Sequence, residues 1–413
     1  MIVEKPASAE PATSAYLDYA AATPLDPEVL EAMTPYLTGR FYNPSAPYAL
    51  ARNVRADVEA ARATVARCIG ARPGNVTFTA GATEANNLAF AATEGHVVTD
   101  AVEHESVLAC AEARSHAIVG VGPDGRVDPE DVLSAVTPAT QLVSVSLANG
   151  EIGCVQPVRE LSRMMAQLRE ARLAAGDLTP LYLHVDASQA ASCLTVDVGS
   201  LGCDLLTLSA AKIGGPKQVG LLWASDDVVL RPLVLGGGQE GGLRSGTENV
   251  AGIIGFARAL ELACARRREE SRRLASLRGR LQRGLLAEFP WAQVSGPKKE
   301  KFRLPGLLHV SFPGLEARRL VIGLEREGVS VGTGSACAAS KMRVSHVLRA
   351  IGMPEEAAAG SLRMTLGRPT TESEVDYAVA AVTRVVRAEM SRLGISDGQA
   401  AANAARIMGG GRQ

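Results

Sequence analysis

The 413-residue chain lacks the features that would tie it to nucleic acid or to a membrane. Its formal net charge is −1, so no excess of basic residues attracts nucleic acid or an anionic lipid surface. No segment approaches 18 uninterrupted apolar residues, and residues 1–10 contain no apolar stretch of a secretory signal. We therefore expect a cytoplasmic protein that neither binds nucleic acid directly nor enters a membrane.

Cysteines are few, and none of the seven lies in a CxxC pair or at the spacing of a metal site. An odd number without framework spacing argues against a set of disulfides and favours a reducing compartment with one reactive thiol. We expect no bound metal. Hydrophobic residues make up 46% of the chain and charged residues 21%, which is ordinary for a globular protein.

Short apolar runs alternate with helix patterns along the chain. This alternation predicts an α/β fold built on a mostly parallel sheet, in which ligands lie beyond the carboxyl ends of the strands. The predicted strands cover residues 76–79, 141–147, 181–186, 204–209, 219–223 and 308–312, and the predicted helices cover 47–69, 158–175, 248–289, 317–327 and 373–393.

Composition and helix length predict the domain boundaries. Residues 1–14 and 396–413 are expected to be a flexible arm and a flexible tail. The predicted helix 248–289 is long enough to link two domains, and we place the boundary near residue 262. Its arginine-rich stretch 266–273 precedes leucines at helical spacing and mixes both signs of charge, which favours a solvated helix face over a nucleic-acid patch.

An acid and a lysine follow two successive predicted strands. Asp186 ends the run 181–186, and Lys212 follows the run 204–209. A pyridoxal 5′-phosphate (PLP) site needs this pair, because the lysine forms a Schiff base and the acid keeps the pyridine nitrogen protonated. The alternative is an ordinary buried aspartate and a surface lysine, and the pair alone does not decide between the two.

Two glycine-containing turns are candidate phosphate sites. The strand 76–79 runs into Gly81, Ala82 and Thr83, where we expect a helix to begin, and free N–H groups with the Thr83 hydroxyl would bind an anion. The alternative there is an ordinary N-cap turn. The loop 236–247, which ends at Thr247, is a weaker candidate because glycine-rich loops are common.

Other side chains could act on a substrate in the same cleft. His104 could stack on a ring or be an ordinary surface histidine, and Arg363 offers a fork for a carboxylate or a structural ion pair. Asn149 and Gln189 follow predicted strands and could face the cleft. Cys337, among small residues, is a candidate nucleophile on an exposed loop, whereas the other six cysteines suit packing.

Taken together, these segments resemble the NifS/IscS-like cysteine desulfurases, a branch of the class V (fold type I) PLP-dependent enzymes. The resemblance runs from about residue 16 to residue 385. It is carried by Tyr16-Leu-Asp-Tyr-Ala-Ala, Asn43-Pro-Ser, Gly81-Ala-Thr-Glu-Ala-Asn-Asn, Gln156-Pro, His184-Val-Asp-Ala-Ser-Gln, Arg244-Ser-Gly-Thr-Glu-Asn, Gly334-Ser-Ala-Cys, Ser345-His-Val-Leu-Arg-Ala and Leu366-Gly-Arg-Pro-Thr-Thr.

The resemblance implies a homodimer of PLP-dependent subunits. Each subunit would have a large PLP domain (31–262) with a mostly parallel seven-stranded sheet flanked by helices, and a small α+β domain (263–395) that packs with the segment 15–30. It also implies the following roles: Lys212 as the Schiff-base lysine, Asp186 on the pyridine nitrogen, His104 on the ring, Gln189 on the phenolic oxygen, Gly81, Ala82, Thr83 and Ser209 on the phosphate with Thr247 from the partner subunit, and Asn43, Asn149 and Arg363 on the substrate.

The implied activity converts L-cysteine to L-alanine. Lys212 would take the Cα proton, and the Cys337 thiolate would receive the sulfur as a persulfide for delivery to an acceptor protein, which the sequence does not name. Four positions depart from the family pattern: Ala211, Gly150, Tyr48 and Gly241 stand where His, Asn, His and Arg are usual. The alternatives are another class V reaction (a transaminase, an epimerase or a β-lyase), or a paralogue with weakened cofactor binding that acts as a sulfur-relay scaffold.

Overall fold

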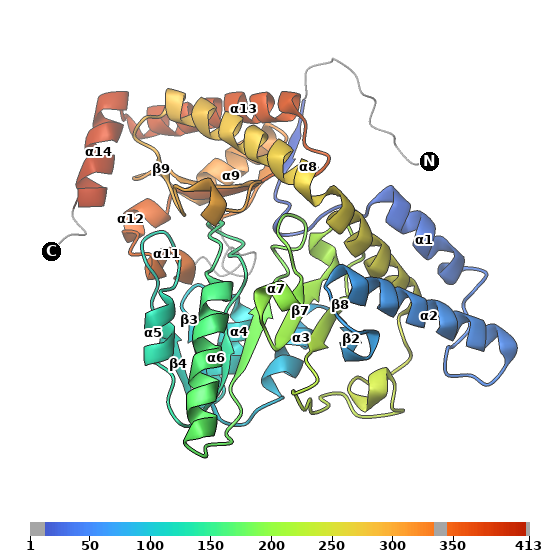
Figure 1. Cartoon of the computed structure of the whole chain (residues 1–413). Helices are drawn as coiled ribbons and strands as arrows, with labels where there is room; N and C mark the ends of the chain where they lie inside the picture. The colour runs from blue at the N-terminus through green and yellow to red at the C-terminus, as the bar shows by residue number, and fades with distance from the viewer. Residues whose placement is uncertain (1–12, 334–344, 410–413) are drawn as a thin grey trace.

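The computed structural model describes residues 13–333 and 345–409. A large part is built around a central sheet, and a smaller part carries a second sheet covered by helices (Figure 1). The long helix α8 (Val250–Glu288) passes from one part to the other. This arrangement confirms the predicted α/β fold.

Seven strands of the described chain form the central sheet, and the sheet is mostly parallel. Four of the pairs are parallel, and one strand, β8, is antiparallel to both of its neighbours. Strands β2, β7 and β8 are buried along their whole length because helices cover both faces. The order is β2 (Val76–Thr79), β8 (Gly220–Ala224), β7 (Leu205–Ser209), β6 (Tyr182–Asp186), β5 (Thr140–Ser144), β3 (His96–Asp100) and β4 (His116–Val119).

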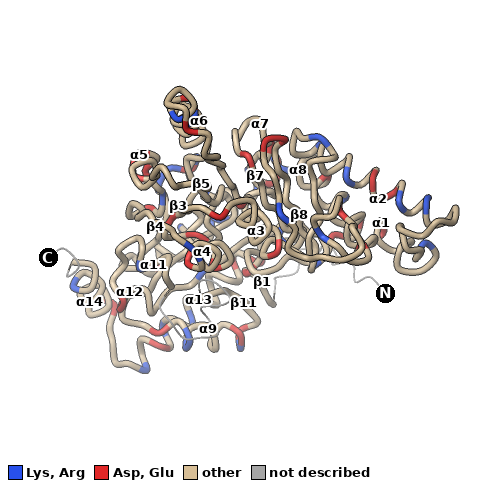
Figure 2. The backbone as a smooth tube through the Cα atoms, turned by 90° about the horizontal axis from the view of Figure 1, so that it is seen from below, with Lys and Arg blue, Asp and Glu red and all other residues tan. Residues whose placement is uncertain are grey.

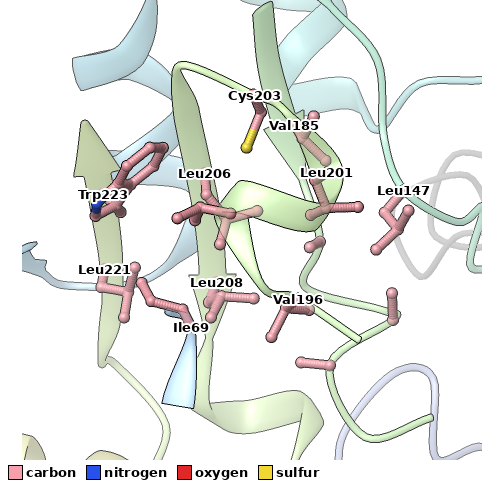
Figure 3. Packing of buried hydrophobic residues seen from close by; sticks show 14 of the residues in the cluster. Ile69, Leu147, Val185, Val196, Leu201, Cys203, Leu206, Leu208, Leu221 and Trp223 are labelled. Atoms are coloured by element: carbon pink, nitrogen blue, oxygen red, sulfur yellow. The ribbon is translucent and has the colours of Figure 1, made fainter. Parts of the chain in front are cut away.

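Apolar side chains of this sheet pack against the helices around it. Leu206, Leu208 and Leu221 from β7 and β8 lie beside Ile69 and Val196 (Figure 3). On α2, the buried residues recur every three or four positions, which gives the helix one apolar face. The helices of this part are α1 (Pro27–Leu37), α2 (Ala49–Cys68), α3 (Ala82–Phe90), α4 (Glu105–Glu112), α5 (Pro129–Ser134), α6 (Val158–Ala174) and α7 (Val198–Leu201).

The smaller part has its own apolar core, to which both ends of the described chain contribute. Ala15 and Leu17 join Leu274 and Leu281 of α8 in this core. The earlier α8 residues Phe256 and Leu260 belong to the core of the large part, so α8 contributes to both cores. The elements are β1 (Ala15–Leu17), β9 (Gln293–Val294), β10 (Leu307–Ser311), α9 (Ala317–Arg326), β11 (Val329–Val331), α11 (His346–Ala350), α12 (Glu355–Ala358), β12 (Ser361–Thr365), α13 (Glu372–Leu393) and α14 (Asp397–Gly409).

One expectation about the C-terminus is wrong. Most of the stretch 396–413 was predicted as a flexible tail, but residues Asp397–Gly409 form helix α14. Ala400, Ala404 and Ile407 recur at helical spacing and are buried, and the first two belong to the core of the smaller part. The alanines provide a narrow apolar face that packs closely, which composition alone did not distinguish from a disordered tail.

Charges of both signs are spread over the molecule (Figure 2). In the arginine-rich stretch of α8, Arg266 pairs with Asp26 and Glu28, and Arg273 pairs with Glu270. Within residues 13–333 and 345–409, no helix combines the length and the apolar composition needed to cross a membrane.

Candidate active site

Two strand ends bring the predicted acid and lysine to the same edge of the sheet. β6 and β7 are parallel neighbours, with Asp186 opposite Thr207, so both strands end on one side. β6 ends at Asp186, and β7 leads into the 3₁₀ turn η2 (Ala210–Lys212), which ends at Lys212. The topology therefore brings Asp186 and Lys212 to one edge of the sheet.

The Asp186 carboxylate is buried, with only 8% of the residue exposed. Its Oδ2 accepts a hydrogen bond of 2.9 Å from Asn86 Nδ2, and its Oδ1 accepts one of 2.9 Å from the Ser188 N–H. Because donors hold both oxygens, the carboxylate has a fixed orientation at the end of β6.

The Lys212 amine is held by the N-terminal segment of the chain. Its Nζ donates hydrogen bonds of 2.7 Å each to the carbonyl oxygens of Ala20 and Ala21. Burial lowers the pKa of Lys212 and the Arg363 charge lowers it further, while the carboxylates of Asp18 and Asp186 act in the opposite direction. A cavity of about 500 Å³ opens beside this lysine and is also lined by Gln189. The amine is thus partly desolvated, which favours its neutral, nucleophilic form.

The predicted phosphate turn lies beside the strand that carries Lys212. Strands β2 and β7 flank β8, and Thr79 and Ser209 are both register partners of Gly220. A Cβ atom on Gly220 would lie 2.6 Å from the carbonyl carbon of Gly81, so only glycine allows this close approach. Gly81, at a φ of 140°, then starts α3, whose first N–H groups are free to bind an anion.

His104 stands at the N-cap of α4 and is exposed. Its Nδ1 accepts a hydrogen bond of 3.1 Å from the Ser106 N–H and lies 2.8 Å from Ser106 Oγ. Asn86, which bonds Asp186, also donates to Ser106 Oγ at 2.9 Å. A continuous set of hydrogen bonds therefore connects His104 with Asp186.

Arg363 is buried and already has two partners. Its Nη2 pairs with Asp18 Oδ1 at 2.7 Å, and its Nη1 donates to the Gly150 carbonyl oxygen at 3.2 Å. Its Nε is buried and has no hydrogen-bond partner among residues 13–333 and 345–409. A free N–H on a buried guanidinium suits an incoming carboxylate. Arg363 reaches from β12 of the small part to Gly150, which lies against Gln189.

The two predicted amide residues hold the loops near this cleft. Asn149 donates from Nδ2 to the Val102 carbonyl oxygen at 2.8 Å, and its Oδ1 accepts from the N–H groups of Glu151 and Ile152. Gln189 donates from Nε2 to the Ala20 carbonyl oxygen at 3.1 Å. Asn149 thus has a second amide hydrogen available for a ligand.

Three predicted site residues are not placed beside Lys212 by any described contact. Asn43 is exposed between α1 and α2, where its side chain accepts from the Ser45 N–H. Thr247 is exposed just before α8. Cys337 lies outside the described residues.

Buried acids next to the site escaped the sequence analysis. Burial raises the pKa of Asp100 to about 7. Burial also raises the pKa of Glu103 well above its usual range, and the charges of Asp100 and Asp186 add to this effect. Asn86 and Asp18 were likewise missed as partners of Asp186 and Arg363, although both lie within segments that carry the family resemblance.

These residues fit PLP. The partly desolvated amine of Lys212 suits the aldehyde of that cofactor, and the Asp186 carboxylate, with both oxygens held, suits the pyridine nitrogen. The helix N-terminus beside Ser209 suits the phosphate. The His104 imidazole, connected to Asp186 through Ser106 and Asn86, would lie against the face of the cofactor ring.

Comparisons with known proteins agree with this assignment. The chain matches the aminotransferase class-V family over residues 15–378. It is 39% identical over 392 residues to cysteine desulfurase IscS of Clostridium botulinum, covering 92% of this chain and 96% of that protein. Its structure is similar to a NifS-like protein, with a TM-score of 0.82 and 32% identity, covering 91% of this chain and 99% of the other.

A further similar structure is that of SspA in complex with cysteine, with a TM-score of 0.72 and 29% identity over 86% of this chain and 99% of that chain. The likeness covers both parts of the molecule, because the matches span nearly the whole described chain. The protein therefore belongs to the aminotransferase class-V family, and within it to the PLP-dependent cysteine desulfurases.

Proposed function

We propose that this chain converts L-cysteine to L-alanine and passes the sulfur, through a persulfide on Cys337, to an acceptor protein. The observation that carries the proposal is the placement of Lys212 and Asp186 at neighbouring strand ends, with the Arg363 guanidinium close enough to affect the Lys212 pKa. PLP, when bound, withdraws electrons from the amino carbon of the substrate. The chain's own residues would do the rest.

Lys212 and Arg363 would act on opposite ends of the amino acid. The lowered pKa of Lys212 suits an amine that takes the Cα proton near neutral pH. The free Nε of Arg363 would bind the substrate carboxylate, with the second amide hydrogen of Asn149 beside it. This arrangement would fix the substrate between the small part and the sheet.

Sulfur transfer would then take place at Cys337. Its thiolate attacks the substrate sulfur, an S–S bond forms as the C–S bond breaks, and the bonding electrons stay with the carbon skeleton, which leaves as L-alanine after protonation. No external oxidant is required, because the sulfur is transferred as a formal S⁰.

We also propose a homodimer in which each subunit completes the other's site. Thr247 and Asn43 are exposed, and neither contacts Lys212 within its own chain. Large apolar side chains are exposed on the loops that carry these two residues and at the start of α2, where a second copy would cover them. They are Phe41, Tyr48, Leu50, Leu233 and Leu235. The domain boundaries, the cytoplasmic location and the identity of the acceptor stay predictions.

The function is tested with purified protein loaded with PLP. L-cysteine and a thiol reductant should yield L-alanine and sulfide in equal amounts, and mass analysis of protein treated with L-cysteine without the reductant should find one extra sulfur on Cys337. Lys212→Ala should abolish alanine formation, Cys337→Ala should abolish the persulfide, and Cys264→Ser serves as the matched thiol control. Full sulfur delivery by Cys337→Ala, or no alanine from the wild type, would refute the proposal.

A further inference from the structure

Two side chains connect the acid and the imidazole of the site. Asn86 Nδ2 donates to Asp186 Oδ2 and to Ser106 Oγ, both at 2.9 Å. Ser106 Oγ in turn lies 2.8 Å from His104 Nδ1. Asn86 is fully buried on α3, and Ser106 lies in the first turn of α4, so two packed helices hold the connection in place.

The orientation of the Asn86 amide is determined by its neighbours. A carboxylate only accepts hydrogen bonds, so the atom 2.9 Å from Asp186 Oδ2 must be the amide nitrogen. The Asn86 oxygen is buried and has no hydrogen-bond partner among the described residues. Turning the amide over would place that oxygen against the carboxylate, which is worse than leaving it unpaired.

The direction of donation continues to the imidazole. The Ser106 main-chain N–H can only donate, so His104 Nδ1 must accept and carries no proton. Ser106 Oγ receives a hydrogen from Asn86 and has one hydrogen of its own to give, which points to the same Nδ1. The ring proton of a neutral His104 is therefore on Nε2.

We propose that Asn86 and Ser106 are positioning residues that hold His104 in its Nε2–H tautomer and Asp186 in its acceptor orientation. The inference rests on the cofactor roles proposed above for His104 and Asp186, and it adds how the chain fixes them. Asn86 acts on the acid and the imidazole together, because its single amide nitrogen supplies both hydrogen bonds.

Two substitutions separate this role from simple packing. Asn86→Leu keeps the volume and removes both donors. Asn86→Asp reverses the donation, because a carboxylate would accept from Ser106 Oγ, which then no longer donates to His104 Nδ1. Asn75→Leu is the matched control, since Asn75 Nδ2 donates to Asp226 Oδ1 at 2.8 Å in a partly exposed place at the edge of the same sheet.

The experiment is ¹⁵N NMR of histidine-labelled protein at pH 7.5, without and with PLP, with His104→Gln to assign the signal among the six histidines. We expect the Nε2–H tautomer in all four proteins, because the Ser106 N–H still donates to Nδ1, and a shifted Nδ1 resonance only in Asn86→Leu and Asn86→Asp, where the Ser106 hydroxyl is no longer directed at Nδ1. The PLP dissociation constant, from absorbance titration, should rise about tenfold in Asn86→Leu and stay unchanged in Asn75→Leu.

An Nδ1–H wild type, or an Asn86→Leu protein with an unchanged His104 signal and unchanged PLP affinity, would overturn the inference. The tautomer is read in the cofactor-free protein and needs no turnover. A protein that shows the expected tautomers but forms no alanine would therefore contradict the proposed function and leave this inference standing.

Discussion

The loop that carries Thr247 is anchored by a buried ion pair, and removing one partner should destabilise the protein strongly. In the 3₁₀ turn η3 (Glu240–Gly242), the Glu240 carboxylate forms two hydrogen bonds of 2.7 Å with the Arg62 guanidinium of α2. Glu240 Oε2 also accepts from the Phe78 N–H of β2 at 2.8 Å. The two side chains are only 10% and 4% exposed.

The expected cost follows from this burial. Burial by itself lowers the pKa of Arg62, but the hydrogen bonds and charge of Glu240 outweigh it, and the net pKa is raised. Glu240→Ala leaves the buried guanidinium with only the largely exposed Glu59 as a carboxylate partner, and it also leaves the Phe78 N–H without its partner. Breaking such a pair typically costs about 3–5 kcal/mol, whereas replacing both charges by apolar side chains is often neutral. We expect about 3 kcal/mol for Glu240→Ala and near-recovery in Arg62→Met/Glu240→Met.

Urea unfolding followed by circular dichroism measures these differences. The matched control is Arg406→Ala, which breaks the exposed 3.1 Å pair with Glu356, whose side chains are 66% and 62% exposed. That change should cost less than about 1 kcal/mol. If Glu240→Ala cost no more than Arg406→Ala, the pair would not anchor the loop. A double variant less stable than Glu240→Ala would refute the account of an uncompensated charge.

Three further outcomes are expected. In Gly150→Ala the new Cβ would lie 2.8 Å from Gln189 Cδ, so the hydrogen bond from Gln189 to Ala20 should be lost, which destabilises the protein by about 1 kcal/mol. The variant should also bind PLP more weakly in a titration, and unchanged PLP binding would contradict the prediction. Burial lowers the pKa of His309 to about 3, so between about pH 6.5 and pH 3 the unfolded chain binds a proton that the folded chain does not. The free energy of unfolding therefore falls as the pH falls through that window, and His309→Phe should remove roughly 2–3 kcal/mol of this decrease at pH 4.5. Urea unfolding measures it, and a His309→Phe protein that loses as much stability in acid as the wild type would contradict the prediction. A hydrogen bond with the Cys68 thiol lowers the pKa of Cys264 to about 7, so among the described cysteines Cys264 should react first with iodoacetamide at pH 7.5. Cys68→Ala should slow the reaction of Cys264. Equal rates in the wild type and in Cys68→Ala would refute the coupling of the two thiols.

The central sheet could be predicted because its strands are long apolar runs. Residues 204–209 and 219–223 read as buried strands and became β7 and β8 within one residue at each end. The short strand β4 was missed because half of its residues are exposed and it begins with His116. β12 was missed because its apolar residues are interrupted by Ser361, Arg363 and Thr365, whose burial comes from tertiary partners.

The acid and the lysine of the site could also be predicted, since each follows a recognisable strand. Their partners could not. Asn86 is 100 residues from Asp186, and Asp18 is 345 residues from Arg363, and no local pattern relates positions so far apart. The structure pairs them because α3 packs on β6 and because Asp18, the residue after β1, forms a bridge with Thr365 of β12.

The Lys212 amine is positioned by a segment that also belongs to the small part. Ala20 accepts from the lysine through its carbonyl oxygen and donates through its N–H to Thr365 Oγ1 of β12 at 2.9 Å. Two residues earlier, Asp18 holds the Arg363 guanidinium on the same strand. The Lys212 amine and the Arg363 guanidinium are thus both held by one short piece of chain. A displacement of the small part would either carry the lysine amine with Arg363 or break the hydrogen bonds that hold the amine, so the positions of the two side chains are coupled.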